Sequence, residues 1–281
     1  MPYTRGSDGI RVFYQVSGRA DGEPLLLVQG LGQDHNGWLL QRFPFGARYR
    51  CIAPDNRGVG RSDKPAGPYD LEQMSEDLVR VLDDAGVERA HVAGVSMGGI
   101  LAQILAVRHP ERVRSLVLAC TACHHHPWRR ELLEEWAEHA TNEGMRSFSR
   151  KNLRWVVGVR SMHRFWPAMQ LLGPIAFDLP AEAFVSQIQA ILDADDSLRS
   201  ELHHIAVPTL VIVGSQDILT PQGDSEEIAS LIPGSRLAVV RGGAHGFMVE
   251  HAGDFNHAVL DFLAEVGDGT PVGAGTHDSV G

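Results

Sequence analysis

The sequence predicts an α/β fold with a mostly parallel central sheet, flanked by helices and interrupted by an all-helical lid between core strands. Apolar runs alternate with helix-like segments in both halves of the chain, as in parallel βαβ units. Residues 122–204 break this alternation, because they carry helical patterns and no convincing strand. A serine flanked by glycines, Ser96, lies where an apolar run meets a helix-like segment.

The first half supplies its elements in a regular order. Residues 10–16 alternate apolar and polar types, which predicts a half-buried strand. The continuous apolar runs over residues 24–28 and 50–54 predict strands that are covered on both faces. Apolar residues at helical spacing predict helices over residues 34–43 and 71–85.

The pentapeptide around Ser96 follows a strand-like run, residues 91–95, and precedes a helix-like run, residues 100–107. Strand, sharp turn and helix in this order form a nucleophile elbow, in which a strained backbone presents the serine hydroxyl. Gly94 and Gly98 let the strand and the helix pass closely. The alternative is an ordinary glycine-rich loop, since G-x-S-x-G is a common pentapeptide.

Beyond the elbow, residues 113–120 form another apolar run, and the alternation resumes at residues 207–213 and 236–240. An amphipathic helix over residues 252–266 closes the pattern. The helical insertion is expected to lie over the carboxyl ends of the strands, where ligands bind in parallel sheets. The predicted division is a core of residues 1–121 and 205–267, a lid of residues 122–204 and a disordered tail of residues 268–281.

A serine nucleophile needs a histidine that accepts its proton and an acid that orients the histidine. Asp217 and His245 each follow a predicted strand of the second half, in the order Ser, Asp, His that such an elbow requires. The alternatives are a capping role for Asp217, for which Asp224 is better placed, and a surface role for His245 among 14 histidines. His251 is a weaker rival, because it lies at the start of the last helix.

Attack on a carbonyl also requires two backbone N–H donors for the oxyanion. We expect one from Met97, directly after the serine, and the other from Leu31, in the loop after the strand over residues 24–28. Gly30 lets this backbone approach the substrate, and Gln29 can hydrogen-bond the loop from behind.

Four motifs make the chain resemble the α/β-hydrolase superfamily from residue 10 to residue 266: segments 55–62, 94–99, 214–217 and 243–247. Within it, the chain looks most like the branch of 3-oxoadipate enol-lactonases and small carboxylesterases, on segments 120–122, 143–145, 191–196 and 205–210. One departure is Gln29-Gly30, where the family usually has His-Gly. The resemblance implies an α/β-hydrolase fold and hydrolysis by a Ser-His-Asp triad.

Substrate contacts are predicted from two catalytic loops and from the lid. Gln29 and Gly30 belong to the oxyanion loop, and Phe247 belongs to the loop that carries His245. Four of the five tryptophans fall in the lid. The lid aromatics either line a pocket or form the lid's own core: Trp128, Trp136, Trp155, Phe165 and Trp166.

The composition excludes several kinds of partner. A formal net charge of −10 leaves no basic footprint for nucleic acid and disfavours anionic membranes, and no apolar run is long enough to span a bilayer. Residues 1–5 lack the pattern of a secretory signal and three cysteines cannot all pair, so we expect a cytoplasmic protein. The expected partner is a small molecule, and the sequence leaves a homo-oligomer open.

Two further motifs are interpreted as structural. Cys120 and Cys123 form a C-x-x-C without a second such pair, and Cys120 closes an apolar run. Adjacent side chains such as His124, His125 and His126 point in different directions in a regular structure, which disfavours convergence on one ion. We therefore predict neither a metal site nor a cofactor.

The sequence predicts a serine hydrolase that acts on a carboxylic ester or lactone, with Ser96 as nucleophile, His245 as base and Asp217 as orienting acid. The same triad serves cofactor-free haloperoxidases or perhydrolases and carbon–carbon bond hydrolases, which stay as alternatives. A ligand receptor with little turnover is the alternative from another class. Epoxide hydrolases and haloalkane dehalogenases need an aspartate on the elbow, so Ser96 argues against both.

Overall fold

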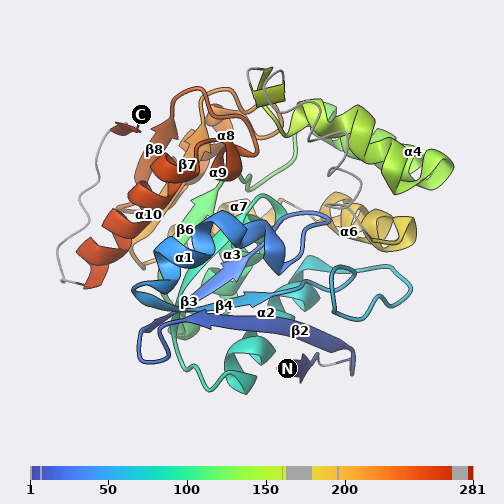
Figure 1. The fold of residues 1–281 in the computed structure, drawn as a ribbon. Helices are drawn as coiled ribbons and strands as arrows, with labels where there is room; N and C mark the ends of the chain where they lie inside the picture. Colours follow the sequence, from blue (N-terminus) through green and yellow to red (C-terminus); the bar gives the residue numbers. More distant parts are fainter. Residues whose placement is uncertain are drawn as a thin grey trace.

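The computed structural model contains one sheet of nine strands (Figure 1) and describes residues 2–6, 8–159, 161–162, 179–194, 196–267 and 278–280. The strands are β1 (Tyr3–Arg5), β2 (Arg11–Gly18), β3 (Glu23–Val28), β4 (Tyr49–Pro54), β5 (Ala90–Val95), β6 (Val113–Ala119), β7 (Thr209–Gly214), β8 (Arg236–Val240) and β9 (Asp278–Val280). Their order is β1-β2-β4-β3-β5-β6-β7-β8-β9. β2 pairs antiparallel with β1 and β4, and all later pairs are parallel, which confirms the predicted fold class.

Successive residues of the central strands pack on opposite faces of the sheet. In β3, Leu26 and Val28 belong to one buried cluster, and Leu25 and Leu27 belong to the other. The first cluster receives side chains from α2 (Leu71–Asp84), α3 (Met97–Arg108) and α8 (Gln222–Leu231). The second receives them from α1 (Leu39–Gly46) and α10 (Ala252–Gly267), so helices cover both faces (Figure 1).

The described part of the lid is helical. It contains α4 (Pro127–Asn152), α6 (Ala181–Asp193), α7 (Ser197–Glu201) and the 3-10 helices η3 (Leu153–Trp155) and η4 (Leu202–His204). The ring centroids of Trp136 and Phe148 lie 5.5 Å apart, and those of Phe148 and Phe184 lie 4.7 Å apart, which joins α4 to α6. Residues 163–178 of the predicted lid, with Phe165 and Trp166, lie outside the described residues.

Three segments differ from the predicted elements. The three residues of β1 are too few to show a periodicity in the sequence. The predicted helix over residues 34–43 begins as a 3-10 turn, η1 (His35–Trp38), before α1. In the tail predicted to be disordered, residues 278–280 pair with β8 as β9, because an edge strand offers its backbone N–H and C=O groups to any extended segment. Residues 268–277 and 281 lie outside the described part.

The parallel strands bring the predicted site together at one edge of the sheet. Leu31, Ser96, Asp217 and His245 follow the carboxyl ends of β3, β5, β7 and β8 respectively. The remaining short elements are η2 (Pro110–Arg112) and α9 (Phe247–Glu250). Within the described ranges, no helix combines the length and apolarity that a bilayer crossing requires.

Candidate active site

Ser96 lies on a sharp turn between β5 and α3. Its backbone has φ 55° and ψ −122°, a conformation that costs a residue with a Cβ about 1–3 kcal/mol. A Cβ on Gly94 would lie 2.2 Å from the Gly98 carbonyl oxygen, and one on Gly98 would lie 2.3 Å from the Val28 carbonyl oxygen. Helix α3 therefore passes too close to β5 for a side chain at Gly94 and too close to β3 for one at Gly98, as a nucleophile elbow requires.

The Ser96 hydroxyl, the His245 imidazole and the Asp217 carboxylate form one hydrogen-bonded chain. Ser96 Oγ lies 3.1 Å from His245 Nε2, and His245 Nδ1 lies 2.9 Å from Asp217 Oδ2. With its proton on Nδ1, the imidazole donates to Asp217 and leaves Nε2 to accept from the serine hydroxyl. The imidazole and the carboxylate are both buried, so bulk water does not screen their interaction.

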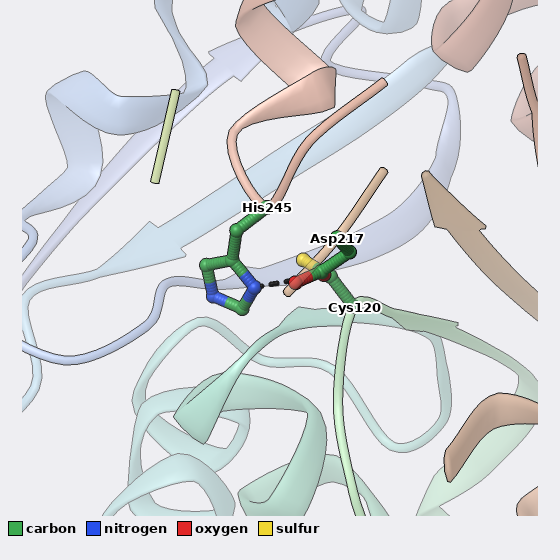
Figure 2. A group of neighbouring side chains, drawn as sticks. All are labelled: Cys120, Asp217 and His245. Atoms are coloured by element: carbon green, nitrogen blue, oxygen red, sulfur yellow. Dashed lines mark hydrogen bonds and ion pairs between the residues drawn. The ribbon is translucent and has the colours of Figure 1, made fainter. Parts of the chain in front are cut away.

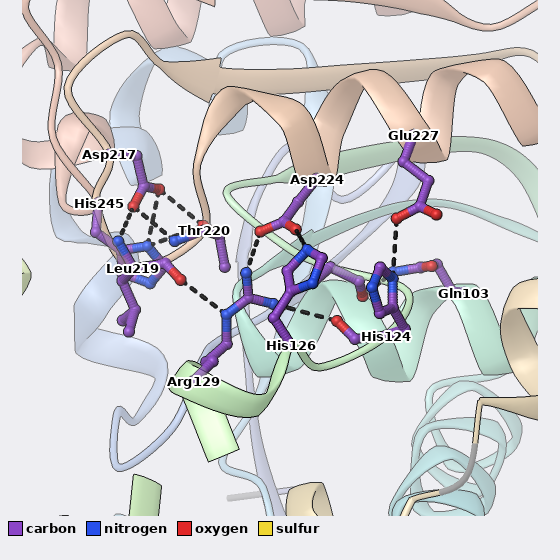
Figure 3. Close-up of polar contacts among 11 residues, drawn as sticks. Gln103, His124, His126, Arg129, Asp217, Leu219, Thr220, Asp224, Glu227 and His245 are labelled. Carbon is purple, nitrogen blue, oxygen red and sulfur yellow. Dashed lines mark hydrogen bonds and ion pairs between the residues drawn. The ribbon is translucent and has the colours of Figure 1, made fainter. Parts of the chain in front are cut away.

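The loop after β7 holds Asp217 through its own backbone (Figure 3). Asp217 Oδ1 accepts the N–H groups of Leu219 and Thr220, each at 2.9 Å, and Oδ2 accepts the Thr220 hydroxyl at 2.8 Å. Burial acts to raise the pKa of the Asp217 carboxyl, but the attraction of His245 and the Thr220 hydrogen bonds outweigh burial and hold this pKa below its ordinary value. Asp217 is therefore ionised at neutral pH, as an acid that orients a histidine must be.

Thr220 is absent from the predicted site, although its hydroxyl also lies 3.2 Å from His245 Nδ1. Thr220→Val keeps the side-chain shape and removes the hydroxyl. We expect kcat to fall up to about tenfold, because a hydrogen bond contributes about 1 kcal/mol. Thr209→Val, at a buried threonine of β7, is the matched control. Equal loss of kcat in both variants would contradict a role for Thr220 in orienting the triad.

The same variant has an expected pH effect. The lowered pKa of Asp217 contributes stability that is present above its unfolded value of about 3.9 and is lost as the pH falls through the folded pKa. Without the Thr220 hydroxyl, the folded pKa moves up toward the unfolded value. Acid unfolding of Thr220→Val, followed by circular dichroism, is therefore expected at a higher pH than in the wild type.

In the turn after β3, the N–H group of Leu31 differs from those of its neighbours in its hydrogen bonding. The other N–H groups of this turn are occupied: Gly30 donates to Gln29 Oε1 at 3.2 Å, Gly32 donates to Gln187 Oε1 at 2.9 Å, and Gln33 donates to the Gly30 carbonyl at 3.2 Å. Within the described residues, no acceptor pairs with the N–H groups of Leu31 and Met97. A Cβ on Gly30 would lie 3.0 Å from the Ser96 Cβ, so the turn packs directly against the serine.

A cavity of about 600 Å³ opens above Ser96 and His245. The lid contributes an apolar wall that includes Leu133, Trp136, Phe148 and Phe184. His125 also lines the cavity, and burial lowers its pKa to about 3, so its imidazole is neutral. The cavity suits a ligand that is mostly apolar and of small to medium size.

Three of the predicted substrate residues line this cavity: Gln29, Gly30 and Trp136. The described lining does not include Trp128, Trp155 or Phe247, which corrects those predictions. Phe247 is fully buried on the other side, where its ring packs 5.6 Å from that of Phe255. Trp128 is an exposed residue beside the Arg129 guanidinium, and Trp155 is partly buried against the larger core cluster, which includes other lid residues. The sequence does not show which face of each lid helix turns to the cavity, because tertiary packing determines it.

His251, the rival for the base, and Asp224, the predicted helix cap, each have another partner. His251 Nδ1 lies 3.5 Å from Asp254 on the same surface segment. Asp224 does not cap α8: it lies inside the first turn, is buried, and pairs with the buried Arg129 of the lid (Figure 3). Burial raises the pKa of Asp224 despite this pairing. The predicted capping role of Asp224 is therefore wrong.

Cys120 lies beside Asp217 and His245 at the end of β6 (Figure 2). Its thiol is fully buried, and burial raises its pKa well above the ordinary value, so it stays protonated. All three cysteines are free. A neutral, buried thiol packs like a small apolar side chain behind the triad.

His124 and its neighbours form ion pairs between the lid and α8 (Figure 3). His124 Nδ1 lies 2.9 Å from Glu227 Oε2, and these groups and the Cys123 thiol lie within 4.8 Å of one another. However, Arg199 Nε already donates to Glu227 at 2.7 Å. Because this guanidinium neutralises the Glu227 carboxylate, the cluster favours an ion-pair network over a metal centre.

The chain is similar to known proteins over most of its length. A family model described as the alpha/beta hydrolase fold matches residues 23–159. The putative carbamate hydrolase RutD of Azorhizobium caulinodans is 33% identical over 95% of this chain and 99% of its own length. The 2-hydroxymuconate semialdehyde hydrolase of Pseudomonas sp. strain CF600 is 32% identical over 92% of each chain. The crystal structure of the enol-lactonase from Burkholderia xenovorans LB400 is 30% identical, with a TM-score of 0.87 over 94% of this chain and 100% of its own.

Proposed function

Since this chain belongs to the α/β-hydrolase superfamily, we propose that it is a serine hydrolase that cleaves a carboxylic ester or a lactone through an acyl-enzyme. The observation that carries this proposal is the hydrogen-bonded chain of Ser96, His245 and Asp217, which meets a cavity that Leu31 and Met97 also line. A nucleophile, a base and an oxyanion hole at one end of a cavity are the parts that acyl transfer needs.

The proposed reaction begins when Ser96 Oγ attacks the substrate carbonyl and His245 Nε2 takes the serine proton. Asp217 stabilises the imidazolium that results, and the N–H groups of Leu31 and Met97 bind the oxyanion. His245 then gives its proton to the leaving alcohol, which in a lactone stays attached to the acyl group. A water molecule that His245 deprotonates attacks the acyl-enzyme, and His245 returns this proton to Ser96 Oγ as the bond to the acyl group breaks and the acid leaves. The residues named supply every step without a cofactor.

The cavity and the relatives guide the choice of substrates. The apolar wall that the lid gives the cavity favours an acyl or ring group of small to medium size over a polar or polymeric substrate. The enol-lactonase and carbamate hydrolase relatives indicate that lactones and aryl carbamates belong in the same panel as linear esters.

The test is the hydrolysis of p-nitrophenyl esters of increasing acyl length, a set of small lactones and an aryl carbamate. We expect turnover of esters or lactones with an optimum in acyl length that the cavity of about 600 Å³ sets. Failure of the folded protein to hydrolyse any of these compounds would contradict the proposal. Tight ligand binding without turnover would then favour a receptor.

A carbon–carbon bond hydrolase is the second candidate, because the 2-hydroxymuconate semialdehyde hydrolase relative is 32% identical. A ring-cleavage product supplied as substrate separates the two candidates, since its loss is followed by absorbance. A parallel assay with peroxide and an organic acid detects perhydrolase activity on the same triad. If kcat/KM for carbon–carbon bond cleavage or for perhydrolysis exceeds kcat/KM for every ester and lactone, that reaction replaces ester hydrolysis as the proposed function.

A further inference from the structure

A glutamine of the lid reaches the loop that carries the predicted oxyanion donor. Gln187 lies on α6 and is fully buried. Its Oε1 accepts the Gly32 N–H at 2.9 Å, and its Nε2 donates to the Arg57 carbonyl at 2.8 Å. One side chain therefore links three segments that lie far apart in the sequence.

The contact with Gly32 acts next to the oxyanion donor. Gly32 directly follows Leu31 and has φ 71°, a left-handed conformation that the tight turn requires. The peptide group between Leu31 and Gly32 carries the N–H that Gln187 holds. The peptide units on either side of Leu31 share its Cα, so when Gln187 holds the Leu31–Gly32 unit, the preceding unit, which carries the Leu31 N–H, can turn only through φ and ψ of Leu31. The orientation of that donor therefore depends on Gln187.

The other end of the contact is anchored in the core. The Arg57 guanidinium donates to both carboxylate oxygens of Asp77, at 2.8 and 3.0 Å, and to Asp8 at 2.9 Å. Both Arg57 and Asp77 are buried. The backbone at Arg57 is thus held in place. Because Gln187 bonds to both the Arg57 carbonyl and the Gly32 N–H, it fixes the turn after β3 relative to this backbone.

We propose that Gln187 is a positioning residue for the oxyanion hole, through which lid helix α6 orients the Leu31 N–H. This inference rests on the proposed function, because it assumes that Leu31 donates to the oxyanion. It makes the contact between α6 and the core part of the catalytic machinery, because this contact supplies the acceptor that holds the Gly32 N–H.

Gln187→Met tests this, because methionine has a similar length and volume but forms neither hydrogen bond. We expect kcat to fall roughly tenfold with KM within twofold, less than the 10²–10³ that loss of an oxyanion donor itself costs. The affinity for a trifluoromethyl ketone, whose hemiketal oxyanion occupies the hole, should fall by the same factor as kcat. Gln189→Met, at an exposed glutamine of the same helix, is the matched control.

Gln187→Glu gives a second readout if the methionine variant fails to fold. A protonated carboxyl can accept from Gly32 and donate to the Arg57 carbonyl as glutamine does, whereas a carboxylate cannot donate. Burial favours the protonated form. We therefore expect the ratio of the variant's kcat to the wild-type kcat to rise as the pH is lowered, which a role limited to packing does not predict.

The outcomes separate this inference from the proposed function. If the wild type hydrolyses esters and Gln187→Met keeps both its kcat and its affinity for the ketone, the positioning role is overturned while the serine hydrolase stands. A fall in thermal stability alone, at unchanged kcat, overturns it equally. If the wild type neither turns over any ester nor binds the ketone, the proposed function itself has failed.

Discussion

Ser96→Ala is expected to lower kcat/KM for ester hydrolysis by about 10⁴-fold or more. The variant keeps the Cβ of Ser96 but removes the hydroxyl that forms the acyl-enzyme in the proposed mechanism, and loss of the nucleophile in a triad has effects of this size. Far-ultraviolet circular dichroism and the melting temperature should match those of the wild type. The measurement is the initial rate with the best p-nitrophenyl ester.

The matched control is Ser230→Ala, at an exposed serine of α8 whose hydroxyl donates to the Glu227 carbonyl. It should leave kcat/KM unchanged within twofold. If Ser96→Ala retained more than a hundredth of the wild-type rate while Ser230→Ala behaved as expected, Ser96 would not be the nucleophile.

Gly98→Ala is expected to be the most disruptive single methyl group in the elbow. The added Cβ would lie 2.3 Å from the Val28 carbonyl oxygen and 2.6 Å from that of Gln29. Both contacts are with backbone, so neither can be relieved by rotating a side chain, and α3 must move away from β3. We expect a loss of stability of about 3 kcal/mol or more. Urea unfolding followed by tryptophan fluorescence measures it.

Gly223→Ala is the matched control for Gly98→Ala, because both glycines lie in the first turn of a helix. Gly223 lies in the first turn of α8, and an added Cβ meets nothing within 4 Å. The same substitution there should be neutral or should stabilise the protein by about 0.5–1 kcal/mol, because alanine has the higher helix propensity. Similar unfolding midpoints for the two variants would show that β3 and α3 do not pass as closely as described.

The order of the core elements was predictable because local patterns encode it. The continuous apolar run of β3 places Leu25 and Leu26 on opposite faces of the sheet, and both faces are covered by helices. The elbow was predictable for a related reason: Gly94 and Gly98 have no room for a side chain, so the spacing of the glycines records a close approach of backbones.

The lid contacts were not predictable, because they depend on how helices are rotated in space. Trp136 faces the cavity while Trp128 lies at the surface, although both belong to α4. Gln187 and Arg129 bind loops that lie 155 and 90 residues away in the sequence, and nothing in their own segments identifies those partners. Arg129 Nε donates to the Leu219 carbonyl at 2.9 Å, beside the backbone that binds Asp217.

The loop after β7 was predictable in part. The position of Asp217 beside His245 was predictable, because Asp217 follows a strand and lies between the serine and the histidine in the expected chain order. Thr220 lies in the same turn and bonds to both Asp217 and His245, but a threonine three residues after an aspartate is common in turns. Only the three-dimensional path of the loop brings its hydroxyl to the imidazole.

The most direct test of the account is the site of covalent labelling by a fluorophosphonate, measured by intact-protein and peptide mass spectrometry. We predict one adduct per chain, on the peptide that contains Ser96, formed at a rate that falls on Gln187→Met and absent from Ser96→Ala. An adduct on another residue, or ester hydrolysis by a protein in which Ser96 is never labelled, would contradict the acyl-enzyme mechanism.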